Sequence, residues 1–435
     1  MKRGFHTIMS AQFFSSLADQ ALFVAAVELL RNAGMPDWQG PALVPIFAVF
    51  YVVLAPVVGA FADALPKGRV MFISNAIKMV GCLMMLVGSH PLLSYAIVGL
   101  GAAAYSPAKY GILTELLPPS QLVKANGWIE GLTVASIILG IAFGGVLVDY
   151  RVSSYLLAID VPFINTGIDA PAQAAIVVLI GVYALAAWFN TRIPLTGVPM
   201  RPLRASPQHG IVHNLLALLP DFWHCNRRLW NDKLGQISLG TTTLFWGAGG
   251  NLKYVVLAWA AVALNYDVAR ASALTGVVAI GTAIGAVLAS ARVRLDKATS
   301  VIPLGILMGL LVIAMNFIHN VWVAVPFLVV LGGIGGFLVV PMNALLQHRG
   351  HNLMGAGRSI AVQNFNEQAC ILLLGGLYSA CTGILDMSAY AAISIFGVVV
   401  AGCMWLIRRW HESNLRKYAE EVEHLLSIAR NDTHC

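Results

Sequence analysis

The chain has 435 residues, of which 58% are hydrophobic and only 11% are charged, and its mean hydropathy is +0.76. Soluble domains are about 45–50% apolar and about 25% charged, so this composition excludes a soluble globular protein and predicts an integral membrane protein. The net charge of +7 would suggest nucleic-acid binding in a soluble chain, but in a membrane protein the excess of basic residues in cytoplasmic loops accounts for it.

Twelve apolar runs are each long enough to cross a bilayer as a helix, which takes about 20 residues. In chain order they are Ile8–Leu30, Leu43–Ala62, Val70–Gly88, Leu92–Leu113, Ala125–Val148, Ala172–Phe189, Gln236–Leu264, Ala271–Ala291, Val301–Phe317, Trp322–Leu346, Ser359–Cys381 and Tyr390–Ile407. The first run follows Met1-Lys2-Arg3 without a small-residue cleavage site, so we expect it to stay as a span. The expected fold class is an all-α integral membrane protein with twelve transmembrane helices.

Basic residues orient these spans. If the N-terminus lies inside, the inner segments hold most of the 27 Lys and Arg residues, and the outer loops hold only Arg31, Arg151 and Arg270. Because cytoplasmic loops carry the excess of Lys and Arg, we expect both termini in the cytoplasm.

Two inner segments have helical patterns of their own. In the long interruption from Thr191 to Lys233, residues Ile211–Trp223 have apolar residues at helical spacing, which predicts a short helix lying on the membrane surface. The tail, Glu412–Arg430, is predicted to be a cytoplasmic amphipathic helix that carries four apolar residues on one face: Leu415, Tyr418, Val422 and Leu425. A solvated anchor and a surface for a partner both remain open for this tail.

The second half of the chain repeats the first. Asp19 and Lys253 are 234 positions apart, and so are Pro107 and Pro341, each late in the fourth span of its half. The resulting domains are a six-helix bundle over 1–190, a linker over 191–233, a second six-helix bundle over 234–410 and a tail over 411–435. This layout is typical of transporters whose pseudo-symmetric halves rock about a site near the bilayer midplane.

Four charged residues lie inside predicted spans: Asp19, Lys109, Lys253 and Glu367. Each costs about 2.5–3.5 kcal/mol or more in hydrocarbon, so such residues usually face a wet interior and have a function. Two acids and two bases suit a ligand that carries both signs of charge. We therefore expect all four to line one substrate-binding cavity. The alternatives are a protonated carboxyl bonded between helices for Asp19, a side chain that reaches the cytoplasmic interface for Lys109, and a structural ion pair for Lys253.

Further polar residues accompany these four. Gln20 adjoins Asp19, and Gln363 and Asn364 share a helical face with Glu367, so all three are predicted to bind substrate. Glu130, with Asn126 one turn before it, is an inner gate or a salt-bridge partner for Lys124 or Lys109. Lys78 stands alone in the third span, and either it pairs with Asp19 or Asp63 or it has a role that the sequence does not reveal.

Small residues mark expected helix contacts. Gly140-x-x-x-Gly144 and Gly281-x-x-x-Gly285 are patterns that let two membrane helices approach closely.

The loop between the second and third spans reads Gly59-Ala-Phe-Ala-Asp63-Ala-Leu-Pro-Lys-Gly68-Arg69. It resembles the inner-loop motif of the major facilitator superfamily, G-x-x-x-D-R-x-G-R. That resemblance implies close helix packing at Gly59 and a conformational latch in which Asp63 meets a helix N-terminus and basic groups. Gly59, Asp63 and Arg69 are therefore expected to be gating residues. Two extra residues separate Asp63 from Gly68, and Ala64 replaces the first arginine.

Longer runs carry a more specific resemblance. They are Gly101–Leu113, Leu122–Gly127, Phe245–Gly249, Pro341–Gln347 and Ala361–Asn364. These runs, spread over both halves, are similar to the bacterial lysophospholipid transporter family of the major facilitator superfamily. The resemblance implies a flippase in the bacterial inner membrane that delivers lysophosphatidylethanolamine and lysophosphatidylglycerol from the outer to the inner leaflet by alternating access. It also implies coupling to an acyltransferase–acyl carrier protein synthetase that re-acylates the product.

Within this resemblance the central charged residues fall on Asp19, Lys109, Lys253 and Glu367. The family usually has arginine at the position of Lys253 and asparagine at that of Gln20. Lysine lacks the planar guanidinium group with which arginine makes bidentate hydrogen bonds to phosphate. The expected path brings the headgroup phosphate to Lys253 and then to Lys109, while Asp19 or Glu367 receives a headgroup amine. The acyl chain is expected to leave through a lateral opening to lipid.

Other functions compete with this one. A proton-coupled exporter of drugs or small metabolites would use Asp19 and Glu367 as proton carriers. A membrane enzyme is disfavoured because no nucleophile–base pair or metal cluster is apparent, and the six scattered cysteines show no C-x-x-C spacing. A receptor or scaffold is disfavoured by the intramembrane charges. We expect no cofactor, no metal and no nucleic-acid partner, and a monomer.

Overall fold

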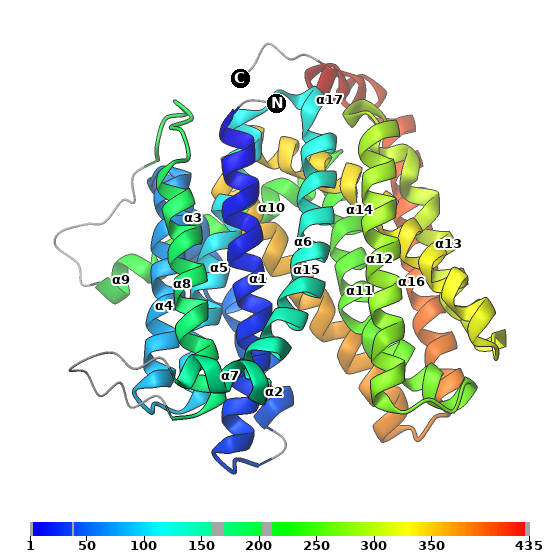
Figure 1. Ribbon diagram of the computed structural model, residues 1–435. Helices are drawn as coiled ribbons and strands as arrows, with labels where there is room; N and C mark the ends of the chain where they lie inside the picture. The colour runs from blue at the N-terminus through cyan, green and yellow to red at the C-terminus, as the bar shows by residue number, and fades with distance from the viewer. Residues whose placement is uncertain (1–2, 37–38, 159–168, 202–210, 431–435) are drawn as a thin grey trace. The chain divides into compact units, whose positions relative to one another are not determined.

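The computed structural model describes residues 3–36, 39–158, 169–201 and 211–430, and contacts divide the chain into two compact units (Figure 1). Unit 1 comprises Met1–Ile112 and Ala135–Leu219, and unit 2 comprises Leu113–Val134 and Pro220–Cys435. The described residues form helices joined by loops and turns, with no strand among them. The domain boundaries predicted above stay a prediction.

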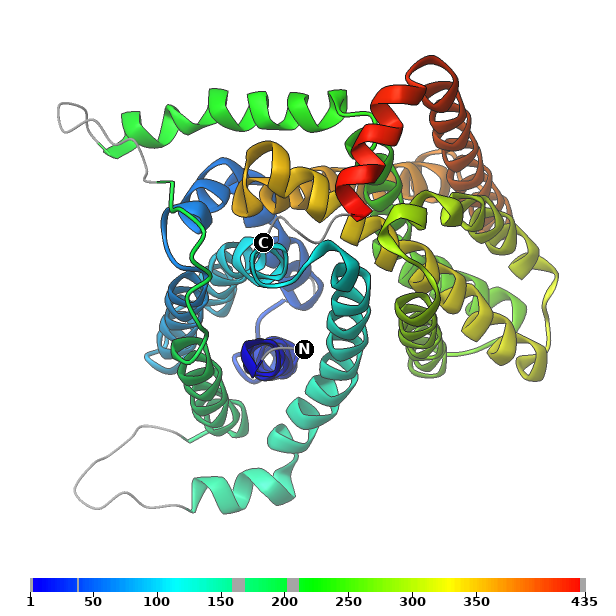
Figure 2. The same cartoon turned by 90° about the horizontal axis from the view of Figure 1, so that it is seen from above.

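Unit 1 is a helical bundle. Its elements are α1 (Arg3–Asn32), α2 (Gln39–Val53), α3 (Ala55–Ala64), α4 (Lys67–Leu86), α5 (Pro91–Leu116) up to Ile112, α6 (Pro119–Val148) from Ala135, α7 (Tyr150–Leu157), α8 (Pro171–Thr191) and α9 (Ile211–Leu216). Helix α8 packs against both α1 and α4, and Figure 2 shows α1 end-on with α8 beside it. Leu22, Ile176 and Leu179 are fully buried at this contact.

Local sequence explains two helix ends in unit 1. Helix α8 begins at Pro171, and the Gln173 side chain accepts hydrogen bonds from the backbone N–H groups of Asp169 and Ala170, at 3.0 and 3.1 Å. The run 43–62, predicted as one span, is instead two helices, α2 and α3, bent by 65° at Leu54. Pro56 lies in the first turn of α3, where its missing N–H interrupts the hydrogen bonds of a continuous helix.

Unit 2 holds the rest of the chain. Besides the end of α5 from Leu113 and the first half of α6, its elements are α10 (Leu218–Asn231) from Pro220, α11 (Gly235–Ala263), α12 (Val268–Arg292), η1 (Leu295–Val301), α13 (Ile302–Ala314), η2 (Met315–Phe317), α14 (Val321–Met354), α15 (Ala356–Ser379), the π-helical turn η3 (Ala380–Ile384), α16 (Ala389–Lys417) and α17 (Ala419–Arg430). The most extensive helix contact is between α12 and α14, which run side by side (Figure 1).

Both predicted small-residue contacts are confirmed. A Cβ atom at Gly281 or Gly285 of α12 would overlap the backbone carbonyl of Val329 or Gly333 in α14. In unit 1, a Cβ at Gly140 of α6 would lie 2.7 Å from the carbonyl oxygen of Leu17 in α1. Glycine is therefore required where these helix backbones touch.

The protein is a multi-pass membrane protein. Among the described residues, nine helices are long and apolar enough to span a membrane, or ten if the bent pair α2–α3 counts as one span. Helices α5 and α11, with 26 and 29 residues, cover the two other predicted spans, so every predicted run is helical.

The linker helix differs from its prediction. Its apolar pattern is divided at Ala217 between α9 and α10, and α10 continues to Asn231. Phe222, Cys225 and Leu229 are buried on one face of α10, and the Phe222 ring packs edge-on against Phe365 of α15 at 5.3 Å. Helix α10 therefore packs its apolar face on protein.

The predicted face of the tail is partly wrong. Val422 and Leu425 are buried on α17, but Leu415 and Tyr418 are each 44% exposed. The reason is that Leu415 still belongs to α16 and the helix breaks at Tyr418, so the four residues do not share one helix. Helix α17 packs on η1, where Arg430 pairs with Asp296 at 3.2 Å.

Candidate functional site

Asp19 lies in a buried ion pair at the centre of unit 1. Its Oδ2 atom is 2.8 Å from the ammonium of Lys78 on α4, and its Oδ1 atom accepts a hydrogen bond of 2.7 Å from the hydroxyl of Tyr183 on α8. The Lys78 side chain is 1% exposed and that of Asp19 is 15% exposed. Of the two partners left open for Lys78, Asp19 is the one that the structure shows.

Other groups complete the coordination of Lys78. Its ammonium donates to the hydroxyl of Ser15 at 3.1 Å and lies 5.0 Å from the ring centre of Tyr105. Ser15 donates in turn to Asn75 at 2.8 Å. Three helices, α1, α4 and α8, thus hold one charge-compensated cluster, and a neutral pair is the form in which a low-dielectric interior tolerates charge.

The remaining predicted residues of unit 1 lie apart from this pair. Gln20 is half-buried. It lies where α1 meets α6, since a Cβ atom added to Gly140 of α6 would be 2.7 Å from the Cβ atom of Gln20. Lys109, in the second half of α5, is 8% exposed, and its ammonium lies 4.2 Å from the ring centre of Tyr110. Sequence spacing therefore located buried polar residues but did not predict which of them touch.

A second polar cluster lies in unit 2 between α14 and α15. The Gln363 amide donates to Glu367 at 2.7 Å and to Asn343 of α14 at 2.9 Å. Gln363 and Glu367 are 6% and 8% exposed, which agrees with the shared helical face predicted for them, while Asn364 is half-buried. Asn343 was not predicted, although the internal repeat relates it to Lys109, again by 234 positions.

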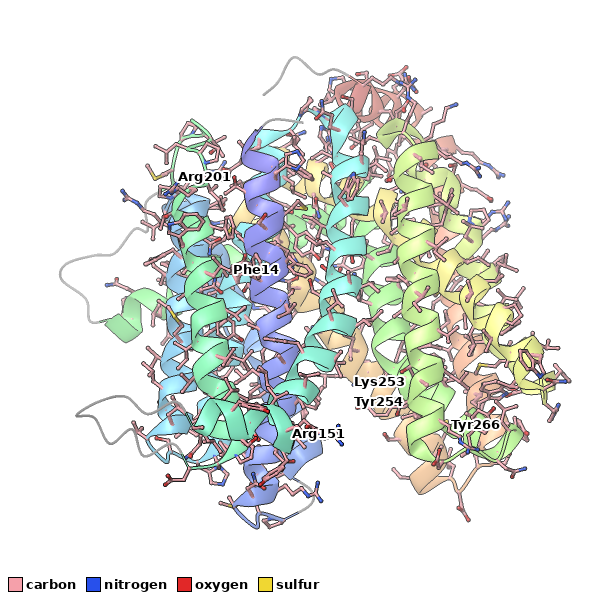
Figure 3. All side chains as sticks on the ribbon, in the orientation of Figure 1. Phe14, Arg151, Arg201, Lys253, Tyr254 and Tyr266 are labelled. Carbon is pink, nitrogen blue, oxygen red and sulfur yellow. The ribbon has the colours of Figure 1, made fainter. Side chains whose placement is uncertain are left out.

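Lys253 of α11 is exposed, next to Tyr254, and both are labelled in Figure 3. Its ammonium is 4.9 Å from the ring centre of Tyr254, and no ion pair to it occurs within the described part of the chain. The buried polar residue on this stretch is Asn251, which donates to the carbonyl oxygens of Gly247 at 2.8 Å and Ile371 of α15 at 2.9 Å. Lys253 is thus a cation on an exposed surface, held near an aromatic ring.

Asp63 of the motif meets a basic group at the start of α4. Its carboxylate is 3.0 Å from the ammonium of Lys67, one turn later, and both side chains are buried. Lys67 is one of the two extra residues that separate Asp63 from Gly68. Arg69 is exposed. Gly59 is buried in α3, as close packing requires.

At the start of α6, Asn126 and Gln347 of α14 exchange two hydrogen bonds of 2.9 Å, and both residues are buried. Glu130, one turn further along α6, is 4% exposed. The amide pair joins α6 to α14 within unit 2 and was not foreseen from the sequence.

Among the described residues, no group of three or more His, Cys, Asp or Glu side chains is placed to hold a metal ion. The clusters described above combine carboxylates with ammonium, hydroxyl and amide groups. Such groups bind polar and ionic ligands by charge and hydrogen bonding.

Comparison with known proteins gives two kinds of match. A sequence model of the Major Facilitator Superfamily matches residues 8–366. The chain is 40% identical over 380 residues to the lysophospholipid transporter LplT of Yersinia enterocolitica, which covers 87% of each chain, and it has the same identity and coverage with LplT of Yersinia pestis.

Solved structures share the fold at low identity. The human organic anion transporter MFSD10 has a TM-score of 0.70 at 14% identity and covers 94% of this chain and all of its own. A bacterial homologue of the iron transporter ferroportin has a TM-score of 0.65 at 14% identity, with 95% of this chain and 99% of its own covered. At this identity the likeness concerns the fold alone.

Proposed function

Because this chain belongs to the Major Facilitator Superfamily, and within it to the family of its lysophospholipid-transporter relatives, we propose that it moves lysophospholipids across a membrane. The observation that carries the proposal is the 40% identity that extends over 87% of both chains. The proposed substrates are lysophosphatidylethanolamine and lysophosphatidylglycerol, taken from the outer leaflet to the inner leaflet of a bacterial inner membrane. Both termini lie in the cytoplasm in this proposal.

Lys253 is the proposed first contact for the substrate phosphate. Its ammonium is exposed and has no ion pair within the described residues, so a phosphate can approach it without displacing a protein carboxylate. The ring of Tyr254 at 4.9 Å limits the positions open to the side chain. Lys109, whose ammonium lies against Tyr110, is the proposed second cation on the path.

Glu367 is the proposed partner for a headgroup amine. Its described contacts are to the amide of Gln363 and not to a basic side chain, so its carboxylate retains acceptor capacity. Gln363, Asn364 and Gln20 complete the proposed set of substrate-binding residues. Asp19 is already paired with Lys78, so a substrate amine reaches it only by competing with that lysine.

Alternating access is the proposed mechanism, as the layout of two pseudo-symmetric bundles implies. Asp63 with Lys67, Gly59, Arg69, Glu130 and the Asp19–Lys78 pair are its proposed conformational elements. The lysolipid product is a substrate for an acyltransferase, so functional coupling to an acyltransferase–acyl carrier protein synthetase belongs to the proposal. The transporter acts as a monomer and needs no cofactor in this scheme.

The decisive experiment follows labelled lysophosphatidylethanolamine in vesicles that contain only this protein, with separate detection of the two leaflets. We expect protein-dependent movement to the leaflet that corresponds to the cytoplasmic face. Absence of movement by the folded protein would refute the function. Movement that stops when the proton gradient is dissipated, with drugs carried in preference to lysolipid, would favour the proton-coupled exporter instead.

Variants test the site. Lys253→Ala removes a charge-assisted contact to phosphate and is expected to lower transport about tenfold or more. Asp19→Ala removes a proposed contact to the headgroup amine and is expected to lower transport by a similar factor. Arg270→Ala is a matched control, since Arg270 is also exposed and lies 5.9 Å from an aromatic ring, that of Tyr266. Undiminished transport by both Lys253→Ala and Asp19→Ala would remove this site assignment.

A further inference from the structure

A cavity of about 350 Å³ lies in unit 2, where the C-terminal end of α14 meets the turn between α5 and α6. Ile428 of α17 lines part of it, so the cavity is complete only while the C-terminal helix is docked. It shares no residue with the proposed substrate site at Lys253 and Glu367. Its volume is at the lower end of the range for small-molecule sites, which suits a molecule of headgroup size and not a whole lipid.

Hydrogen-bond donors gather on one side of this cavity. The last turns of α14 contribute His348, Arg349, His351 and Asn352, and α5 contributes Thr114. All five side chains carry N–H or O–H groups, and no Asp or Glu is among the residues described as lining the cavity. Donors without an acid favour an anionic ligand over a cationic one.

Arg349 is fixed in place for such a ligand. Its Nε and Nη2 atoms donate to the two carboxylate oxygens of Asp232, at 3.1 and 2.6 Å. The side chains of Arg349 and Asp232 are 5% and 7% exposed. The ion pair uses one edge of the guanidinium, so Nη1 lies outside it and the planar fork keeps a donor for a phosphate oxygen.

His348 also favours a ligand in this cavity. The residue is 6% exposed, its Nε2 atom lies 3.4 Å from the amide of Asn352, and its Nδ1 atom has no hydrogen-bond partner among the described residues. Leaving a buried polar nitrogen without a hydrogen bond costs free energy. A ligand oxygen or a water that pairs with this nitrogen, after rotation of the ring, removes that cost.

The other residues that line the cavity are apolar. Leu117 and Leu122, from the turn before α6 and its first residues, face the same space as Ile428. A bare inorganic anion makes no use of these side chains, whereas the glyceryl part of an organic phosphate packs against them.

We propose that this cavity is a second, non-transport site that binds a phosphate ester of headgroup size, with the phosphate on Arg349, His348 and His351 and the organic group against Leu117, Leu122 and Ile428. Because Ile428 belongs to α17, the bound ester also holds the C-terminal helix in its docked position. The site provides a way for a soluble phosphate ester to act on the transporter through its tail.

The test is calorimetric titration of the purified full-length protein with sn-glycero-3-phosphoethanolamine and, separately, with inorganic phosphate. The choice of this ester rests on the proposed function, and a Lys253→Ala background removes the proposed transport contact. We expect saturable binding of the ester in that background, tighter than that of inorganic phosphate. His348→Leu and His351→Leu are expected to weaken it about tenfold or more. His319→Leu is the control, since His319 is exposed and its described contacts are with Phe317 and Tyr390, neither of which lines the cavity.

A second measurement needs no variant of the cavity. Trypsin cleaves after exposed Lys417, at the junction of α16 and α17, and the ester should slow this cleavage in the wild-type protein. Binding that disappears with Lys253→Ala, equal affinity for inorganic phosphate, or cleavage unaffected by saturating ester would each overturn the proposal. A cavity filled by water only would give no titration heat at all. Failure of lysolipid movement in vesicles would leave these results unchanged and would count against the proposed function alone.

Discussion

Neutralising one member of the Asp19–Lys78 pair should destabilise unit 1 strongly. In Asp19→Asn the Lys78 ammonium, 1% exposed, loses its only carboxylate partner among the described residues. Removing one partner of a buried pair costs roughly 3–5 kcal/mol because an uncompensated charge remains in the interior. The hydrogen bond from Tyr183 to Asp19 contributes far less, since interhelical hydrogen bonds in membranes average about 0.6 kcal/mol. The charge term therefore decides the outcome.

A double-mutant cycle isolates that term. We expect Asp19→Asn and Lys78→Met each to lower the free energy of unfolding by roughly 3–5 kcal/mol, and the double variant to stay within about 1–2 kcal/mol of the wild type, since a neutral pair replaces an ionic one. The assay is unfolding of the purified protein by SDS, followed by tryptophan fluorescence. Additive losses in the double variant would show that the two residues are not coupled, and the account of unit 1 as a charge-compensated cluster would be wrong.

Three further predictions use contacts of unit 2. Gly285→Leu should prevent α12 from packing on the backbone of α14 and abolish folded protein on size exclusion, whereas Gly276→Leu on the same helix, where a Cβ meets nothing within 4 Å, should leave it intact. Asp232→Asn should lower the free energy of unfolding in SDS by roughly 3–5 kcal/mol, because the ion pair of Asp232 is buried. Asp221→Asn should lower it by at most about 1 kcal/mol, because Asp221 is in an exposed pair, and equal losses would contradict this account. Asn126→Ala should cost about 1–3 kcal/mol in the same assay, since it leaves a buried amide unpaired.

Hydropathy predicted the helices well because each span must bury its backbone polar groups internally, which leaves an apolar run of fixed length as its signature. It did not predict the bend between α2 and α3, because Pro56 and its flanking residues are all apolar and do not interrupt the run. The tail prediction failed at Leu415 and Tyr418 because the pattern alone does not show where one helix ends and the next begins.

The polar clusters were predictable only within a helix. Gln363 and Glu367 are four residues apart on α15, so periodicity placed them together, and the structure shows a hydrogen bond of 2.7 Å between them. Tyr183 and Asn343 reach their clusters from other helices, α8 and α14, and nothing in the local pattern marks those contacts. For the same reason the sequence left two partners open for Lys78.

Asp19 and Glu367 are both predicted to bind a headgroup amine, but their contacts differ, and this difference bears on headgroup selection. Asp19 accepts hydrogen bonds from Lys78 and Tyr183. A substrate amine that binds Asp19 must displace Lys78, so its net binding free energy is only the difference between the two interactions. Glu367 accepts from an amide in its described contacts, so an amine meets a carboxylate without a competing cation. Discrimination between lysophosphatidylethanolamine, which carries an amine, and lysophosphatidylglycerol, which does not, should therefore depend more on Glu367 than on Asp19. Since specificity is a difference of affinities, the uncompensated acid is the one able to supply that difference.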